Sequence, residues 1–576
     1  MLVLKRNTSK LALYAHIMND YYDLGTYSRP ITSTSPQAQT WFDRGLNWTY
    51  GFNHEEAIRC FEKAIEHDDQ CAMIHWGLAY AYGPYINKEW RFYAHDELVR
   101  KLPIMRQAVA RANELAKEPV EKALAEALTV RYQSDIPLPS AEMDRWHDDF
   151  ANAMRLVCEQ FPQDRDAIAL TVESMMMRTP WRLWDLKAGE PTAGADTLEM
   201  MQLLEGGMGL ADAQNLPPHP GLCHMVVHTL EMSPFPERAM SAANDLRGLV
   251  PDSGHLNHMP THIDTLCGKY HDAVIASGRA IAADKKYLAQ LGPFKQYTAA
   301  VCHDNHQMMF ASMFLGRWET AIGAADMIRN LVTDEVLLRS TPAFQITLES
   351  YVSMRMHVFI RFGKWEEIID EPMPENPTLY PVTTAMHHYA KAIAQATLGD
   401  FEAAELERSK FEQTLAGISE ERHLFNNTSH IILAIARQMM LGEIAYHQGD
   451  YEPAFAHLRQ AVALNDGLFY TEPWAWMHPP RHALGALLLA QGRLDEAEAV
   501  YKADLGLDES VSRASQHPDN VWSLHGYVEC LEKLGKGDEV VKWQPKLEAA
   551  LALTDTPILS SCMCRKMDNS SASCCE

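Results

Sequence analysis

Residues 41–64 read WFDRGLNWTYGFNHEEAIRCFEKA, and this stretch decides the fold. Apolar residues recur at helical spacing on both sides of Gly51. A glycine at such a point supplies the left-handed backbone that ends one helix, and the next helix begins directly after it. The stretch therefore predicts two helices joined by a tight turn.

The same turn recurs along the chain, as a glycine followed by a polar residue and then by an aromatic residue or leucine. Its later copies are Gly268-Lys269-Tyr270, Gly316-Arg317-Trp318, Gly363-Lys364-Trp365, Gly399-Asp400-Phe401, Gly449-Asp450-Tyr451 and Gly492-Arg493-Leu494. Recurrence of one supersecondary unit indicates a repeat architecture, in which neighbouring units bury a shared apolar face. The spacing of the copies is irregular, so the array is degenerate.

Small and aromatic residues recur at fixed offsets within these units. The first copy has Gly45, Ala57, Phe61 and Ala64, and a late copy repeats the offsets with Gly442, Ala454, Leu458 and Ala461. A tetratricopeptide repeat (TPR) has its packing residues at these positions, and strand patterns are nearly absent. We predict an all-α, right-handed TPR solenoid of helix pairs with a concave groove lined by histidines. We predict that the chain has three segments: an N-terminal extension (1–34), a solenoid (35–545, with metal-site repeats at about 218–330) and a flexible, cysteine-containing tail (546–576).

Composition excludes several classes of partner. Lys and Arg total 51 against 76 Asp and Glu, a net charge of -25, so neither nucleic acid nor an anionic membrane is an expected partner. No apolar run suits a signal peptide or a membrane span. Seven cysteines stand singly in the body of the chain, which is typical of reduced thiols in a cytoplasmic protein.

Seven histidines occupy matching positions in three adjacent repeats. In the repeat that ends at Gly268 they stand at 255, 258 and 262, which is 13, 10 and 6 residues before the glycine. Spacings of three and four place side chains on one face of a helix. First helices of TPR units line the concave side, with axes about 8–10 Å apart. The set is His224, His228, His255, His258, His262, His303 and His306, and we predict that it forms a metal centre for one or two ions.

The ligand type restricts the metal. Imidazoles suit copper, iron and zinc, and the scarcity of carboxylates argues against magnesium and calcium. Copper or iron is favoured, with zinc possible. Glu231 follows His228 by three residues on the same face, and with Asp304 it is a candidate catalytic carboxylate or a group that orients an imidazole.

Four tryptophans are candidates for the walls of a substrate groove: Trp181, Trp184, Trp474 and Trp476. The first two begin a stretch from Pro180 to Pro220 that is rich in glycine and proline. This composition predicts a long connection over the concave side, and long loops in compact proteins are often functional.

Two histidine motifs carry a family resemblance. They read His224-x3-His228-x2-Glu231 and Gly254-His255-Leu256-x-His258-Met259-Pro260-x-His262-Ile263. From about Ser35 to Leu534 the chain resembles a family of large TPR proteins for which no common reaction is known. The family usually has His-Asn-x-His where this chain has His303-Asp304-Asn305-His306. The resemblance implies the solenoid fold and makes the histidine face a family feature, but it implies no reaction.

These observations favour a metal-dependent oxidoreductase. A copper- or non-haem-iron-dependent oxidase or oxygenase would act on a small organic substrate in the groove, with dioxygen as a possible second substrate. Two alternatives stay open: a non-catalytic TPR scaffold that binds a peptide or protein partner, and a zinc-dependent hydrolase. No phosphate-binding loop, nucleophile elbow or His-Glu-x-x-His motif suggests another chemistry.

Overall fold

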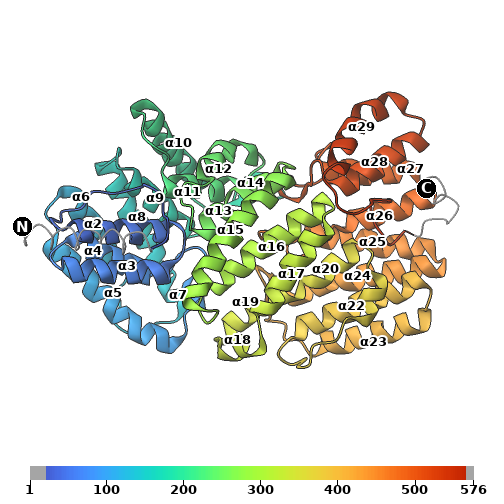
Figure 1. Cartoon of the computed structure of the whole chain (residues 1–576), viewed down its shortest axis with the longest axis horizontal. Helices are drawn as coiled ribbons and strands as arrows, with labels where there is room; N and C mark the ends of the chain where they lie inside the picture. Colours follow the sequence, from blue (N-terminus) through green and yellow to red (C-terminus); the bar gives the residue numbers. More distant parts are fainter. Residues whose placement is uncertain (1–20, 566–576) are drawn as a thin grey trace, which may run out of the picture.

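The computed structural model describes residues 21–565 and confirms an all-α solenoid (Figure 1). Helix pairs follow one another along the long axis of the molecule. Among the described residues, strands occur only as two short hairpins, β1 (Trp184–Asp185) with β2 (Glu190–Pro191) and β3 (His423–Leu424) with β4 (Asn427–Thr428). No helix within residues 21–565 combines the length and hydrophobicity needed to cross a membrane.

The first half contains α2 (Pro36–Tyr50), α3 (His54–His67), α4 (Ala72–Tyr82), η1 (Trp90–Phe92), α5 (His95–Leu115), α6 (Pro119–Thr129), α7 (Ser140–Met143), α8 (Arg145–Gln160), α9 (Arg165–Met176), α10 (Thr197–Gln214), α11 (Pro220–Leu230), η2 (Pro236–Ala239), α12 (Met240–Leu246), α13 (Gly254–His258), α14 (Pro260–Leu266) and α15 (Tyr270–Leu291).

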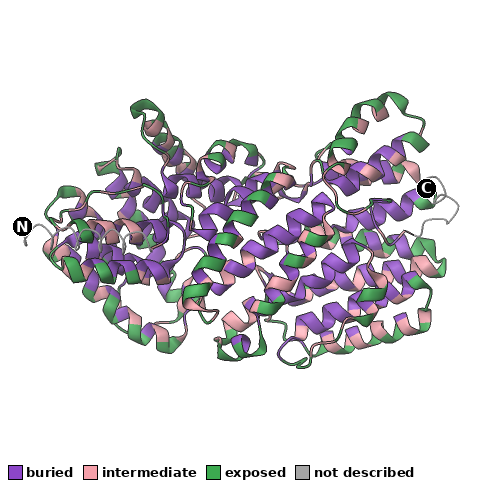
Figure 2. Cartoon of the chain, viewed as in Figure 1, coloured by how far each residue is buried: buried purple, intermediate pink, exposed green. Residues whose placement is uncertain are grey.

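The second half contains α16 (Thr298–Leu315), α17 (Trp318–Leu331), α18 (Asp334–Arg339), α19 (Pro342–Ser353), α20 (Arg355–Arg361), α21 (Trp365–Asp370), α22 (Pro381–Leu398), α23 (Phe401–Ala416), α24 (Ser429–Gln448), α25 (Tyr451–Asp466), α26 (Pro480–Ala490), α27 (Leu494–Leu505), η3 (Arg513–Ser515), α28 (Val521–Lys533) and α29 (Gly537–Leu551). Each half has its own hydrophobic core, and the two cores meet around α15 and α16. Exposed residues lie on the outer faces, as on α5 and α23 (Figure 2).

Close approach between helices depends on the small residues that the sequence singled out. Phe61 is buried between Gly45 and Gly77, where an added Cβ would lie 2.7 and 2.4 Å from its Cε1. Tyr501 repeats the arrangement near the other end, between Gly485 and Gly526. Aromatic rings packed onto glycines thus fix the distance between successive helices.

The substitution Gly77→Ala is expected to destabilise the fold by about 1–3 kcal/mol, because the new methyl group overlaps the Phe61 ring. Urea unfolding followed by circular dichroism measures the effect. Gly206 lies inside α10 with open space where a Cβ would stand, so Gly206→Ala should stabilise the chain by up to about 1 kcal/mol. Equal effects at the two glycines would contradict this packing account.

The turn glycines behave as predicted with one exception. Gly268, Gly316 and Gly492 have φ of 73°, 72° and 68°. At the first turn Gly51 has a φ of -88°, and Phe52 takes the left-handed backbone instead, with a φ of 55°. Gly51 is required there by space, because a Cβ would lie 2.5 Å from the Ser253 Oγ.

The predicted connection between Pro180 and Pro220 is wrong over Thr197–Gln214, which form the 18-residue helix α10. Figure 1 shows this helix standing out from the body of the solenoid. Gly207 packs against Leu222, and Met200 and Leu204 are buried. Burial of this apolar face outweighs the low helix propensity of the glycines.

The two ends of the described chain pack on the solenoid. Residues 21–34 of the predicted N-terminal extension run along the first helices and bury Tyr22 and Leu24, whereas residues 1–20 lie outside the described part. The structure differs from the predicted flexible tail over 546–565: α29 continues to Leu551, and the segment after it folds back into the second core and buries Cys562 and Cys564. Cys574 and Cys575 lie outside the described residues.

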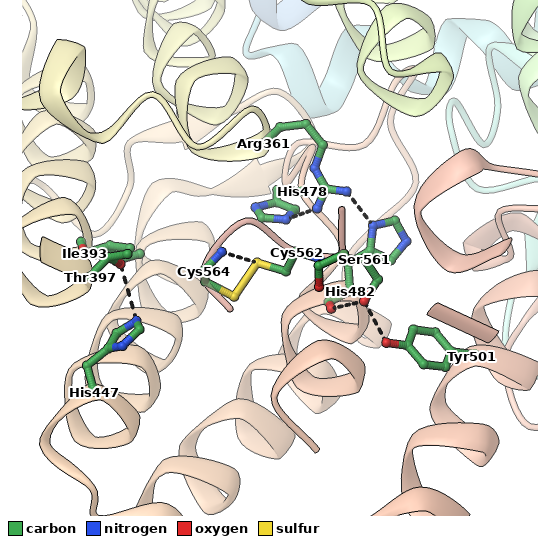
Figure 3. Close-up of a disulfide and its surroundings, with 11 residues drawn as sticks. Arg361, Ile393, Thr397, His447, His478, His482, Tyr501, Ser561, Cys562 and Cys564 are labelled. Carbon is green, nitrogen blue, oxygen red and sulfur yellow. Dashed lines mark hydrogen bonds between the residues drawn. A yellow bond between two sulfur atoms is a disulfide. The ribbon is translucent and has the colours of Figure 1, made fainter. Parts of the chain in front are cut away.

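Specific contacts hold this returning segment, which we call the C-terminal plug (residues 556–565). Its Ser561 Oγ donates to the His482 carbonyl oxygen at 3.0 Å and lies 2.7 Å from the Tyr501 hydroxyl (Figure 3). Cys562 and Cys564 form a disulfide within it. The plug therefore fills space between the C-terminal helices.

Candidate metal centre

Helices α11, α13, α14 and α16 bring six of the seven predicted histidines together. His224 and His228 lie on α11, His255 and His258 on α13, His262 on α14, and His303 on α16. Five of the six residues are at most 2% exposed, and His303 is half-buried. A cluster of this size in the interior is unusual, because buried polar groups normally require partners.

The six imidazoles form two triads. His224, His228 and His255 make the first triad, in which the ligating nitrogens all lie within 4.8 Å of one another. The second triad meets the same condition and consists of His258, His262 and His303. The Nε2 atoms of His224 and His255 are 3.1 Å apart, and those of His258 and His262 are 2.7 Å apart.

The triads are adjacent. Ring centroids of His228 and His262 are 5.9 Å apart, as are those of His255 and His258. Phe52 closes the other side of the first triad, stacked at 5.2 Å on His255. The two triads therefore form one continuous imidazole cluster.

Both triads are built from the same positions of successive repeats. Each takes the histidines 10 and 6 residues before one turn and the histidine 13 residues before the next turn. The second triad uses the same positions one repeat further along the chain, so the two sites are equivalent. The sequence predicted one shared face, and the structure divides it into two triads.

His306 is the histidine that the structure places elsewhere. Its Nε2 lies 3.2 Å from the Met477 Sδ, and its ring stacks on Phe425 at 5.2 Å. A third triad would need histidines 6 residues before Gly316 and 13 before Gly363, and those positions hold Phe310 and Ser350. His306 therefore lacks the partners that the other six have.

Acceptors behind the imidazoles fix their orientation. The Nδ1 of His224 donates to the Tyr50 carbonyl oxygen at 2.7 Å. Glu231 accepts from the Nδ1 of His228 at 2.8 Å and from that of His262 at 2.5 Å, so one carboxylate joins both triads. Asp304 lies 3.4 Å from the Nδ1 of His258. Such a partner on Nδ1 fixes the ring and leaves Nε2 for an ion. Glu231 is placed to orient two imidazoles, whereas Asp304 makes no hydrogen bond to His258 among the described residues and stays a candidate.

Electrostatics favour neutral imidazoles. Burial, followed by the charge of neighbouring histidines, places the pKa values of His224, His255, His258 and His262 well below the usual range. The pKa of His303 is lowered to about 4 by the same causes. Neutral imidazole is the form that binds metals.

Glu472 is a site residue that the sequence prediction missed. It lies between α25 and α26, and its carboxylate is 3.4 Å from the Nδ1 of His262. Burial and the charge of Glu231 raise its pKa, and burial raises the pKa of Glu231 to about 8, so the two carboxyls hold a proton between them at neutral pH. Only the fold brings Glu472 to His262, which lies more than 200 residues away in the sequence.

The donor set fits a transition metal. The buried Nε2 of His228 and Nδ1 of His258 have no hydrogen-bond partner among the described residues. Two nitrogens that share one ion at about 2.0–2.1 Å lie about 2.9–3.3 Å from each other, close to the two short Nε2 separations. The His228 Nε2 is therefore a buried lone pair that an ion in the first triad would satisfy.

A cavity of about 460 Å³ reaches the cluster and is lined there by His255, His303 and Glu472. Trp181 also lines it, with its ring 5.8 Å from that of His228. The structure corrects the prediction for the other three tryptophans, which belong to the packing of the helices. Trp184 donates to the Thr229 carbonyl oxygen, Trp474 donates to the Ala514 carbonyl oxygen, and Trp476 packs on His357 and Tyr389.

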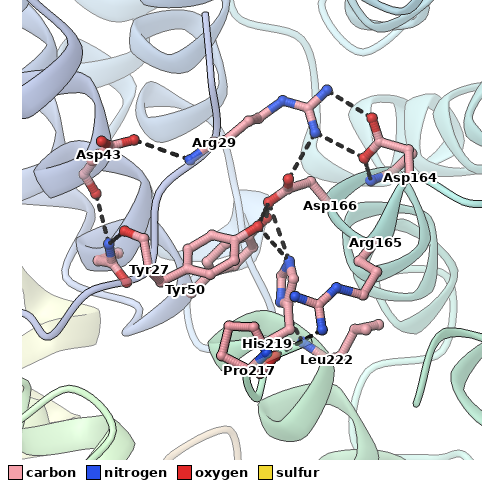
Figure 4. Close-up of polar contacts among 12 residues, drawn as sticks. Tyr27, Arg29, Asp43, Tyr50, Asp164, Arg165, Asp166, Pro217, His219 and Leu222 are labelled. Carbon is pink, nitrogen blue, oxygen red and sulfur yellow. Dashed lines mark hydrogen bonds and ion pairs between the residues drawn. The ribbon is translucent and has the colours of Figure 1, made fainter. Parts of the chain in front are cut away.

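A buried network supports the backbone of Tyr50, whose carbonyl holds His224. The Tyr50 hydroxyl donates to Asp166 at 2.5 Å, and Asp166 also accepts from Tyr27 and Arg29 at 2.6 and 2.7 Å (Figure 4). His219 lies 3.2 Å from the same carboxylate. Arg29 lowers the pKa of Asp166 far below the usual range, although burial opposes it. Residues 21–34 thus contribute to the support of the first triad.

Comparison with known proteins supports the repeat architecture. The tetratricopeptide repeat family model matches residues 385–405 and 478–502. These segments include the turns between α22 and α23 and between α26 and α27. A comparison with curated protein sequences gave no match.

Similar solved structures include the human IFIT1 dimer with m7Gppp-AAAA, at 10% identity over 91% of this chain and 92% of that chain, with a TM-score of 0.31. Yeast Tom70 has 11% identity over 89% of this chain and 99% of that chain, with a TM-score of 0.28. The APC/C hetero-tetramer Cut9-Hcn1 has 13% identity over 92% of this chain and 95% of that chain, with a TM-score of 0.25. Likeness at this level carries no information on ligands. The fold is a solenoid of TPR-type helical repeats, and it assigns no activity by itself.

Proposed function

We propose that this protein is a metal-dependent enzyme with two ions, one in each histidine triad. The observation that carries the proposal is the pair of equivalent triads, each with three nitrogens within 4.8 Å of one another in the interior. A cluster of six imidazoles has no evident role in stability, because each buried ring costs desolvation free energy. Three protein ligands per ion would leave coordination positions open for small molecules.

Copper or iron is the metal we favour, and the activity is that of an oxidase or oxygenase. Direct ligands that are all imidazole suit copper in particular, and imidazole with carboxylate nearby also suits iron. A bound redox metal would supply the electron transfer that side chains alone cannot perform.

The chain's own residues would bind and position a small organic substrate. The cavity leads to His255 and His303, which belong to different triads, so a molecule in it lies beside both. Glu231 keeps His228 and His262 in fixed orientations. Glu472 lines the cavity and lies next to Glu231, where it can hold a proton beside the substrate.

A scaffold that binds a peptide or protein partner is the second candidate. The TPR match supports it, because helical solenoids present extended concave binding surfaces. The C-terminal plug buries Ser561 and Cys562 among the C-terminal helices, so a peptide would have to displace it there. A zinc-dependent hydrolase at the same triads is the third candidate, and metal identity separates it from the first.

Oxygen uptake tests the redox proposal. Protein loaded with copper or with iron(II) is placed in an oxygen electrode with ascorbate as reductant, beside the same protein loaded with zinc. We expect catalytic oxygen consumption with one of the redox metals and none with zinc beyond the buffer rate. Stoichiometric metal binding without oxygen consumption above the rate of the free ion would refute the redox assignment.

Glu231→Gln should weaken the affinity of both sites for metal by about 10–100-fold, because the amide cannot accept from two imidazoles as a carboxylate does. Competition with a chromophoric chelator measures the two dissociation constants. Glu237→Gln, an exposed change in η2, is the matched control and should leave both constants unchanged. Weakening of only one site would show that Glu231 does not join the triads.

A further inference from the structure

The cavity beside the triads has walls whose backbone is strained. Phe52, Trp181 and Phe425 have φ of 55°, 59° and 54°, and all three line the cavity. The other non-glycine residues with positive φ in the described chain are Asn215 and Asp519, of types that accept this backbone most readily. Bulky residues held in this conformation are concentrated at functional sites.

These three rings come from separate connections: Phe52 and Trp181 contact histidines of the first triad, and Phe425 stacks on His306. Phe52 lies in the turn between α2 and α3 and stacks on His255. Trp181 precedes β1 and meets His228 edge-on at 5.8 Å. Phe425 lies in the turn between β3 and β4 and packs on Tyr351 at 4.8 Å. Aromatic rings set around a space favour stacked or edge-on contact with another aromatic ring.

Side-chain charge is balanced at one end of the cavity. Lys88 and Lys101 both donate to Glu97, at 2.8 and 2.7 Å. Arg91 pairs with Glu89 at 2.7 Å. The wall and its ion-pair partners thus hold three cations and three carboxylates near this end, namely Lys88, Arg91 and Lys101 with Glu55, Glu89 and Glu97. No sign is in excess among these side chains, so this end of the cavity favours a neutral group.

In the wall, His54 has a buried hydrogen-bond acceptor without a partner among the described residues, as Thr471 and Glu472 also do. The His54 Nδ1 donates to the Ala81 carbonyl oxygen at 3.0 Å, which leaves the Nε2 with a free lone pair. His54 lines the cavity, and its Nε2 has no partner in the described structure. Burial lowers its pKa to about 3, so the ring stays neutral. A buried acceptor of this kind favours a ligand that carries a donor.

We propose that the cavity binds a neutral aromatic substrate that carries a hydroxyl group, with its ring among Phe52, Trp181 and Phe425 and its hydroxyl donating to the His54 Nε2. The volume of about 460 Å³ suits one or two fused rings with substituents. The inference rests on the proposed function, since it names the substrate class of the same centre. It assigns His54 and Phe425 as specificity residues outside the triads.

Isothermal titration calorimetry with four probes tests each feature separately. 2-Naphthol has all three features, naphthalene lacks the hydroxyl, trans-decahydro-2-naphthol lacks the aromatic ring, and 2-naphthoate is charged. We expect 2-naphthol to bind the metal-loaded full-length protein most tightly, with each of the others weaker by about tenfold or more. Absence of 2-naphthol binding, or equal affinity for the decahydro compound, would overturn the proposal.

Variants locate the site. His54→Leu should weaken 2-naphthol binding by about tenfold and leave naphthalene binding unchanged, whereas Phe425→Ala should weaken both probes alike. His67→Leu, at the exposed end of the same helix, is the control and should bind as wild type does. Equal loss of both probes in His54→Leu would contradict the hydrogen bond, and thermal unfolding checks that each variant is folded.

The titrations are repeated on chelator-treated protein so that the two proposals fail separately. Binding of 2-naphthol by a protein that takes up no metal would refute the proposed function and leave the ligand class standing. Two bound ions with no discrimination among the four probes would refute the ligand class alone.

Discussion

Replacing His258 and His262 together with alanine is expected to reduce the metal content of the protein from two ions per chain to one. The two residues supply two of the three imidazoles of the second triad, and His303 alone cannot hold an ion. The first triad shares no imidazole with the second, so its ion should stay. Plasma mass spectrometry on the desalted protein gives the stoichiometry.

Two further variants sharpen this expectation. His224→Ala with His228→Ala should remove the other ion and leave the second triad filled. His306→Ala should keep both ions, because His306 lies against Met477 and Phe425. Loss of metal in the His306 variant, or loss of both ions when only one triad is changed, would contradict the division into two triads.

Asp166→Asn is expected to destabilise the protein by about 1–3 kcal/mol, because it removes one of the two carboxylate partners of buried Arg29, the other being Asp164, and a charged acceptor of two tyrosines. The folded-state pKa of Asp166 lies below its ordinary value, so its stabilisation is complete above about pH 3.9 and is lost as the pH falls further. The variant should therefore lose more stability at pH 7 than at pH 3. Urea unfolding at several pH values measures the difference.

The matched control is Asp69→Asn, an exposed change, which should leave the unfolding curve in place. Metal affinity is a second readout, and it distinguishes a role of Asp166 in positioning the first triad from a role in stability alone. Since the network holds Tyr50, whose carbonyl fixes His224, the Asp166 variant should bind metal more weakly in the first triad than in the second. Equal loss of metal affinity at both triads would contradict the support of His224 by Asp166 through Tyr50.

The sequence predicts the fold well because TPR packing is local. Gly45, Phe61 and Gly77 are close in the chain, and their contact sets the helix spacing that recurs along the solenoid. The same locality explains why six histidines were identified, since equal offsets in neighbouring repeats become neighbours in space. His306 shares the offset but lacks partners in the following repeat, which a single-helix pattern does not reveal.

The remaining parts of the site depend on long-range contacts. Glu472 reaches His262 from a connection without periodic structure, and no local signal marks it. Three of the four tryptophans were misplaced because an aromatic residue near an irregular stretch is as compatible with packing as with a groove. The C-terminal plug is polar and short in sequence, yet Ile558, Cys562 and Cys564 are buried against the second core.

Elemental analysis of purified, tag-free protein is the most direct test of the metal centre. The protein is reconstituted with copper, iron(II) and zinc in turn, desalted and measured by plasma mass spectrometry beside the His258/His262 double alanine variant. We predict two equivalents of copper or iron per chain in the wild type and one in the variant. Protein that retains no metal after reconstitution with any of the three would contradict the account and leave the scaffold function as the better explanation.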